Sequence, residues 1–143
     1  MMYFFNPSLI FLLLEKKLLK SGKQHKSISL NKQLLLLTKE KNILLRAILK
    51  LITPVTFKTK KIGHIKYQIP ILTHYYKSIK LAIYWLVKAA RVRSFNKMPF
   101  VKAIYLECHD VIKKQGIAYT YKQQYIKKTL ANRIFIYLIT LKK

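Results

Sequence analysis

The spacing of apolar residues changes twice along this chain of 143 residues, and that change constrains its fold. From Lys41 to Ile52 they recur at steps of three and four, as on one face of an α-helix. From Val55 to Ile71 they alternate singly around a glycine-bearing turn at Ile62–Ile65, as in a β-hairpin. Helical spacing returns from Tyr75 to Arg93. The pattern therefore predicts a hairpin inserted between helices.

We expect a mainly α fold, a bundle of about six helices with a projecting two-stranded β-hairpin between the third and fourth helices. We predict that one domain spans residues 1–143, since no repeat or linker interrupts the pattern. The predicted helices cover about 7–20, 29–37, 41–52, 75–93, 99–115 and 122–138, and the hairpin about 55–71.

The two strands are each half apolar. We expect one apolar face of Val55, Phe57, Tyr67, Ile69 and Ile71, and an opposite face of Lys58, Lys60 and Lys66. An isolated ribbon is marginally stable in water, so helices at its base or a ligand should support it.

Three helices have recognisable inner faces. In the first, the buried stripe is predicted from Leu9, Leu12, Leu13 and Lys16 or Lys17. For 75–93 it is Ile79, Ala82, Ile83, Leu86 and Ala90, with a second face of Lys77, Lys80, Tyr84, Lys88 and Arg91. For 99–115 it is Val101, Ile104, Cys108 and Val111, with Gly116 ending the helix.

The charge is strongly unbalanced, with 29 Lys and Arg against 4 Asp and Glu, a net charge of +25. Such an excess predicts a polyanionic partner, with nucleic acid as the first candidate and an anionic membrane surface as the second. The chain is also 52% hydrophobic, which excludes a disordered basic tail and indicates a folded core carrying cations. No apolar run is long enough to span a membrane.

Side chains for catalysis are sparse. The one cysteine, Cys108, excludes an intramolecular disulfide and is predicted to be a buried apolar residue. The four acids form no evident carboxylate pair, and the four histidines lack metal-ligand spacing. We expect neither an enzyme nor a cofactor or metal, and an RNA-modifying enzyme lacks the residues it would need.

Four motifs resemble one family in order and spacing. They are Lys61-Ile62-Gly63-His64-Ile65-Lys66-Tyr67-Gln68-Ile69-Pro70, the segment from Trp85 to Arg93, the pair Glu107 and Gly116, and Ala131-Asn132-Arg133-Ile134-Phe135. This order is similar to the bacterial-type small-subunit ribosomal protein number seven, also called the universal S-seven family. Lys20-Ser21-Gly22-Lys23 is similar to the family's turn after its first helix.

The resemblance implies a structural ribosomal protein that binds the 3′ major (head) domain of small-subunit rRNA and assists head assembly. Its expected partners are neighbouring ribosomal proteins, with mRNA and exit-site tRNA nearby. Trp85 is expected to lie in the core, and Tyr67 to pack through the apolar face of the hairpin. The cationic, aromatic and hairpin-tip residues expected to contact RNA are Lys23, Lys58, Lys60, Lys61, His64, Lys66, Lys77, Lys80, Tyr84, Lys88, Arg91, Arg93 and Arg133.

The expected location is the mitochondrial matrix, on a mitochondrial ribosome, with a plastid as the alternative. Residues with A/T-rich codons dominate the chain, and hydrophobic Met1–Phe5 stands where the family has a basic arm. The rival hypothesis is a basic amphipathic protein bound to a membrane surface.

Overall fold

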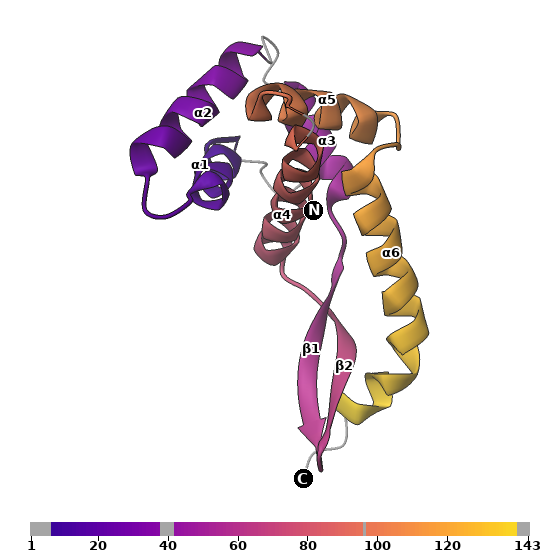
Figure 1. Ribbon diagram of the computed structural model, residues 1–143. Coiled ribbons are helices and arrows are strands. Elements are labelled where there is room, and N and C mark those ends of the chain that lie inside the picture. The colour runs from indigo at the N-terminus through magenta and orange to yellow at the C-terminus, as the bar shows by residue number, and fades with distance from the viewer. Residues whose placement is uncertain (1–6, 38–41, 96, 140–143) are drawn as a thin grey trace.

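A computed structural model describes residues 7–37, 42–95 and 97–139. It confirms the mainly α fold with a hairpin between the third and fourth helices (Figure 1). The expected contribution of Met1–Phe5 lies outside the described residues. The elements are α1 (Pro7–Leu18), α2 (Gln24–Leu37), α3 (Asn42–Leu51), β1 (Val55–Ile62), β2 (Ile65–Leu72), α4 (Tyr75–Ser94), α5 (Phe100–Ile112), α6 (Ile117–Ala131) and the 3-10 helix η1 (Asn132–Ile139).

The core is built around α4. Every residue of its predicted inner face is buried, and so is every residue predicted for the inner face of α5. These side chains join a single cluster with residues of α1, α2, α3 and α6. Burying each Leu or Ile contributes roughly 1.5–3 kcal/mol, so this shared cluster is what holds the helices together.

The inner face predicted for α1 is partly wrong. Leu13 is buried as expected, but Leu12 is 48% exposed, and Ile10, Leu14 and Leu18 complete the buried stripe. The buried stripe is therefore rotated about the helix axis relative to the predicted one, and Lys16 and Lys17 are exposed.

Two helices begin earlier than predicted. α2 starts at Gln24 rather than 29. The prediction missed its first turns because the inward residues there, Ser27 and Asn31, are polar and give no apolar pattern. α6 starts at Ile117 rather than 122, and Gly116 occupies its N-cap position instead of ending α5. The last predicted helix also divides, since α6 stops at Ala131 and η1 follows.

The predicted assignment of the ribbon faces is wrong. Gly63, with φ +59°, and His64 form a two-residue turn that pairs Ile62 with Ile65. Directly paired residues share a face. Lys58 therefore shares a face with Ile69 and Lys60 with Tyr67, while Phe57 shares the other face with the pairs Thr59–Gln68 and Lys61–Lys66.

The ribbon projects from the helices, and α6 and η1 run alongside it (Figure 1). The Tyr125 ring of α6 lies 5.0 Å from Phe57 and 5.1 Å from Trp85, which is only 5% exposed. Farther along, Tyr67 packs on Phe135 of η1 with ring centroids 5.3 Å apart. The expected support thus comes from the C-terminal part of the described chain. Trp85 is buried as predicted, whereas Tyr67 packs from the ribbon face that it shares with Lys60 and not from the predicted apolar face.

A charge cluster joins α4, α5 and α6. The Arg93 Nη2 atom lies 2.9 Å from Glu107 Oε2 and 2.5 Å from Asp110 Oδ2. Glu107 is fully buried, and its Oε1 accepts a 2.7 Å hydrogen bond from the Ala118 N–H in the first turn of α6. The cluster therefore fixes the start of α6 against α5, and α6 in turn supports the ribbon.

Candidate nucleic-acid interface

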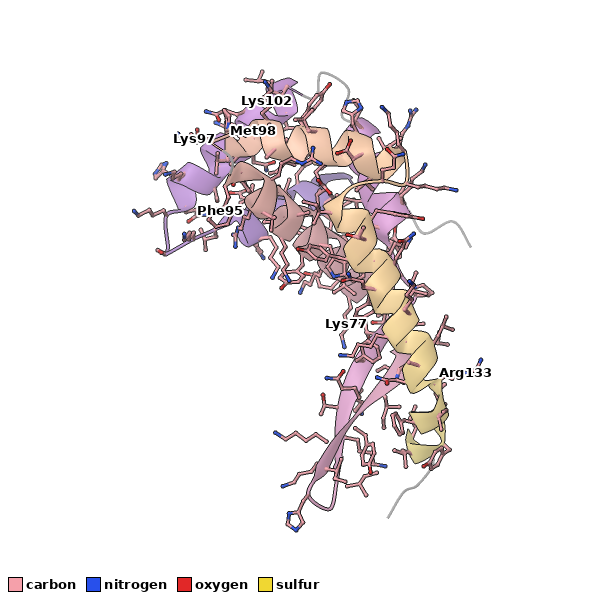
Figure 2. The ribbon with its side chains drawn as sticks, turned by 45° about the vertical axis from the view of Figure 1, so that its right-hand side comes forward. Lys77, Phe95, Lys97, Met98, Lys102 and Arg133 are labelled. Carbon is pink, nitrogen blue, oxygen red and sulfur yellow. The ribbon has the colours of Figure 1, made fainter. Side chains whose placement is uncertain are left out.

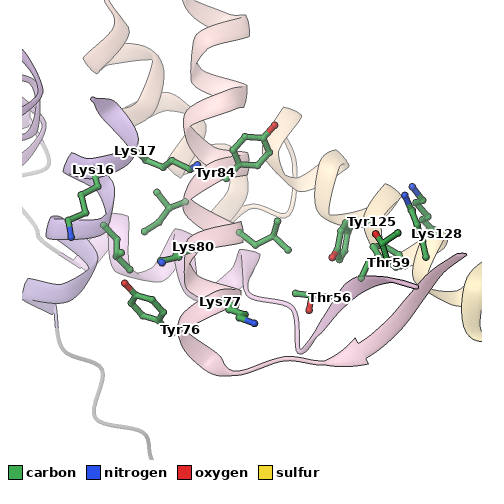
Figure 3. Close-up of a pocket in the computed structure, with 15 residues that line it drawn as sticks. Lys16, Lys17, Thr56, Thr59, Tyr76, Lys77, Lys80, Tyr84, Tyr125 and Lys128 are labelled. Carbon is green, nitrogen blue, oxygen red and sulfur yellow. The ribbon is translucent and has the colours of Figure 1, made fainter. Parts of the chain in front are cut away.

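A cavity of about 810 Å³ lies where α1, α4 and α6 meet the base of the ribbon (Figure 3). We call it the basal groove. Five lysines line it, and none of its described lining residues is acidic. The lysines come from three helices far apart in sequence and are Lys16, Lys17, Lys77, Lys80 and Lys128.

Aromatic rings hold three of these ammonium groups. Lys80 Nζ lies 4.2 Å from the centre of the Tyr76 ring, and Lys17 Nζ lies 5.1 Å from that of Tyr84. Lys128 Nζ lies 5.5 Å from the centre of the Phe57 ring. Such contacts contribute about 0.5–1 kcal/mol each at exposed sites, so they restrict lysines that would otherwise be mobile. The groove presents cations in preferred positions.

One face of the ribbon extends this surface. Thr59 and Gln68 line the basal groove, and the next pair on the same face, toward the tip, is Lys61–Lys66. Both lysines are exposed. The groove and this ribbon face therefore form one cationic track along the molecule.

The predicted RNA-contacting residues are distributed unevenly. Lys77, Lys80 and Tyr84 line the basal groove, and Lys61 and Lys66 extend it. Lys58 and Lys60 lie on the other ribbon face, and His64 is exposed at the tip. The remaining residues lie away from the groove lining and are Lys23, Lys88, Arg91, Arg93 and Arg133.

Several predicted contacts have partners within the fold. Lys60 Nζ donates a 2.6 Å hydrogen bond to the Leu138 carbonyl, which ties η1 to the ribbon. Arg93 is paired with two carboxylates. Lys88 Nζ lies 4.9 Å from the centre of the Tyr121 ring.

Sequence reasoning missed Lys16, Lys17 and Lys128 as groove residues. The first two were predicted to mark a buried stripe, and Lys128 lies in a helix without a clear apolar pattern. The sequence contained two indications of their role, namely their positive charge and the expectation that helices support the ribbon. Only the packing of α1 and α6 around α4 brings them to one place.

Two other lysines act inside the fold. Lys50 Nζ donates a 2.6 Å hydrogen bond to the Ile112 carbonyl at the end of α5, and Lys122 Nζ donates to the Lys50 carbonyl. Cations at helix C-termini satisfy free carbonyls and oppose the helix dipole. Burial lowers the pKa of Lys122. Part of the positive charge therefore serves stability.

The cysteine is buried in the core, as predicted. Burial, with a smaller effect of neighbouring Glu107, raises the pKa of the Cys108 thiol to about 12. In the part of the chain that the structure describes, no three His, Cys, Asp or Glu side chains gather as metal ligands. Within those same residues no helix is both long and apolar enough to cross a membrane.

Known proteins resemble this chain over most of the described residues. A family model described as ribosomal protein S7p/S5e matches residues 10–133. Small ribosomal subunit protein uS7 of a Nitratiruptor species is 33% identical over 78 residues, covering 54% of this chain and 49% of the relative. Small ribosomal subunit protein uS7c of Cyanidium caldarium is 32% identical over 93 residues, covering 65% and 58%.

A third relative, small ribosomal subunit protein uS7 of Wolbachia sp. subsp. Brugia malayi, is 30% identical over 89 residues, covering 61% of this chain and 56% of the relative. The chain thus spans about half the length of the curated relatives it matches. The family model, in contrast, extends from α1 to η1. This chain therefore belongs to the ribosomal protein S7p/S5e family.

Proposed function

We propose that the chain is a structural constituent of a small ribosomal subunit and binds the head domain of its rRNA. The family match and the names of the relatives support the ribosomal assignment. The basal groove carries the RNA-binding part of the proposal, because five lysines without an acidic lining residue form a site for phosphates.

The mechanism is electrostatic clamping. A lysine ammonium acts as a point charge without the fixed fork of a guanidinium, so these lysines neutralise phosphates without reading bases. The groove is bounded by helices on one side and the ribbon on another, which suits a junction of RNA helices recognised by shape. Binding there holds the junction in one geometry and assists assembly of the head.

The ribbon supplies the second part of the proposal. Its tip, Gly63-His64, is exposed and projects from the helices (Figure 1). We assign it a position beside the mRNA exit path and exit-site tRNA, in a mitochondrial ribosome. The projection of the ribbon supports the position beside the mRNA path, and the A/T-biased composition supports the mitochondrial origin.

The burial of the inner face of α1 supports RNA rather than a membrane surface as the polyanion. A membrane-bound amphipathic helix needs a free apolar face. In α1, a helix rich in apolar residues, Ile10, Leu14 and Leu18 are at most 6% exposed because they pack in the core.

The test replaces two groove cations, in the double variant Lys77→Gln/Lys80→Gln. The control Lys32→Gln/Lys102→Gln removes the same charge from two exposed positions that do not line the basal groove. Binding to small-subunit rRNA is measured against salt concentration. We expect the groove variant to bind about tenfold more weakly, and its log–log salt slope to fall by about one per lysine.

Equal behaviour of the two variants would contradict the groove assignment. Ultraviolet crosslinking in native extract then identifies the RNA. Crosslinks concentrated in the 3′ half of small-subunit rRNA agree with head binding, whereas crosslinks spread over unrelated RNAs contradict it.

A further inference from the structure

A second cavity of about 630 Å³ lies at the α1–α2 turn, the C-terminus of α4 and the start of α5. We call it the turn pocket. It shares no lining residue with the basal groove. Phe95, which lines the pocket, lies at the helical end of the molecule in Figure 2, whereas Arg133 lies on the part that accompanies the ribbon.

The turn pocket has a cationic rim and an apolar floor. None of the described residues lining it is acidic, and the four cations are exposed. Leu18 is buried, and Leu30 and Phe100 are partly buried against the core. The rim cations are Lys20, Lys23, Lys26 and Arg91.

Phe95 stands at the edge of this pocket with 85% of its surface exposed. It is not on a free loop, because its N–H bonds to the Val92 and Arg93 carbonyls and continues the last turn of α4. The Ser94 hydroxyl donates to the Arg91 carbonyl in the same turn. The backbone at Phe95 therefore continues the helix, and its exposed aromatic ring lies at the edge of a pocket that four cations line.

We propose that the turn pocket binds an unpaired nucleotide of RNA, with the base stacked on Phe95 and the flanking phosphates among the rim cations. Aromatic stacking and basic rims are how proteins bind single-stranded nucleic acid. A cavity whose charged lining residues are all positive suits a phosphate chain better than a protein of mixed charge.

This inference rests on the proposed RNA-binding function and extends it. The basal groove accepts a helical junction, and the turn pocket accepts a single-stranded nucleotide. Because the two cavities share no lining residue, the two RNA segments would bind at separate places on the chain.

The experiment uses the full chain and an oligouridylate of 12 nucleotides that carries one 2-aminopurine base. The fluorescence of 2-aminopurine falls when the base stacks on an aromatic ring. The variants are Phe95→Ala and Phe95→Trp. Leu36→Ala is the control, because Leu36 is also largely exposed, at 75%, and lines neither cavity. Binding is followed by anisotropy, and affinity for small-subunit rRNA is measured in parallel.

We expect Phe95→Ala to lose most of the quenching and to bind rRNA roughly 5- to 100-fold more weakly. Phe95→Trp should retain both signals, and Leu36→Ala should match the unmodified chain. Quenching and rRNA affinity of Phe95→Ala within twofold of the unmodified chain would overturn the inference while leaving the ribosomal function intact. Failure of the unmodified chain to bind rRNA would overturn both.

Discussion

Arg91 and Arg93 show that neighbouring cations of one sequence motif have different surroundings. Arg91 is exposed at the turn pocket, whereas Arg93 contacts Glu107 and Asp110. Both were predicted to contact RNA, and spacing could not separate them because the carboxylate partners of Arg93 lie on another helix. RNA contact by Arg93 remains a prediction, but its geometry is that of a residue joining α4 to α5.

Replacing Arg93 tests this division. Arg93→Leu leaves the buried Glu107 carboxylate without its cation, so we expect unfolding in urea to require about 2–4 kcal/mol less free energy. The exposed Arg91→Leu should change the free energy of unfolding by less than about 0.5 kcal/mol and should weaken RNA binding instead. Similar stability losses in both variants would contradict the structural role of Arg93.

Gly116 is a second residue with a specific structural requirement. Its φ is +91°, and a Cβ atom there would lie 2.9 Å from both Glu107 Oε1 and the Asp110 Cβ. Gly116→Ala should therefore lower the free energy of unfolding by roughly 2–3 kcal/mol through backbone strain and displacement of the charge cluster.

Gly22→Ala provides the matched comparison for Gly116→Ala. Gly22 also has a positive φ, +71°, but nothing lies within 4 Å of its added Cβ. It should show only the backbone strain, about 1 kcal/mol. Equal losses in the two urea titrations would show that the close approach at Gly116 does not matter.

At the scale of elements, apolar spacing was sufficient where polar residues separate the apolar ones, but not in α1, where consecutive apolar residues left the inner face ambiguous. The inner faces of α4 and α5 were predicted for that reason. The start of α2 was missed because Ser27 and Asn31 are its inward residues, and the ribbon faces were wrong because pairing depends on the turn. A shift of the strand register by one residue moves every side chain to the opposite face, and the sequence pattern alone does not determine that register.

The ribbon's dependence on η1 gives an element-scale prediction. Phe135→Ala removes the ring that packs on Tyr67, and an aromatic pair contributes about 0.5–1.5 kcal/mol beyond buried area. We expect faster amide hydrogen exchange in the distal halves of β1 and β2, with α4 and α5 unchanged. Ile134→Ala, at a neighbouring position that is 69% exposed, should leave exchange unaltered. Unchanged ribbon exchange in Phe135→Ala would contradict the support.

On the scale of the whole molecule, charge and burial act against each other. The core gathers residues from all six helices, while a net charge of +25 opposes compaction. The sequence predicted this combination and the polyanionic partner. It did not locate the basal groove, because the five groove lysines meet only when α1, α4 and α6 pack together.

Self-repulsion predicts an unusual salt response. Raising NaCl from about 50 to 300 mM shortens the screening length from about 14 to 6 Å, so the folded chain should gain stability. We expect the thermal midpoint to rise by several degrees, about 1 kcal/mol in free energy. A sucrose series of equal osmolality separates screening from solute exclusion. A midpoint that falls with salt would contradict the argument.

The position of η1 against the ribbon also affects the order of folding during synthesis. β2 ends at Leu72, but η1 begins only at Asn132. At about 5–20 residues per second, a ribosome needs roughly three to twelve seconds to make the intervening residues. During that interval the nascent ribbon has emerged without the aromatic and backbone contacts that later hold it. A chaperone or an RNA that binds the cationic face during this interval would therefore contact a hairpin that can still change its shape.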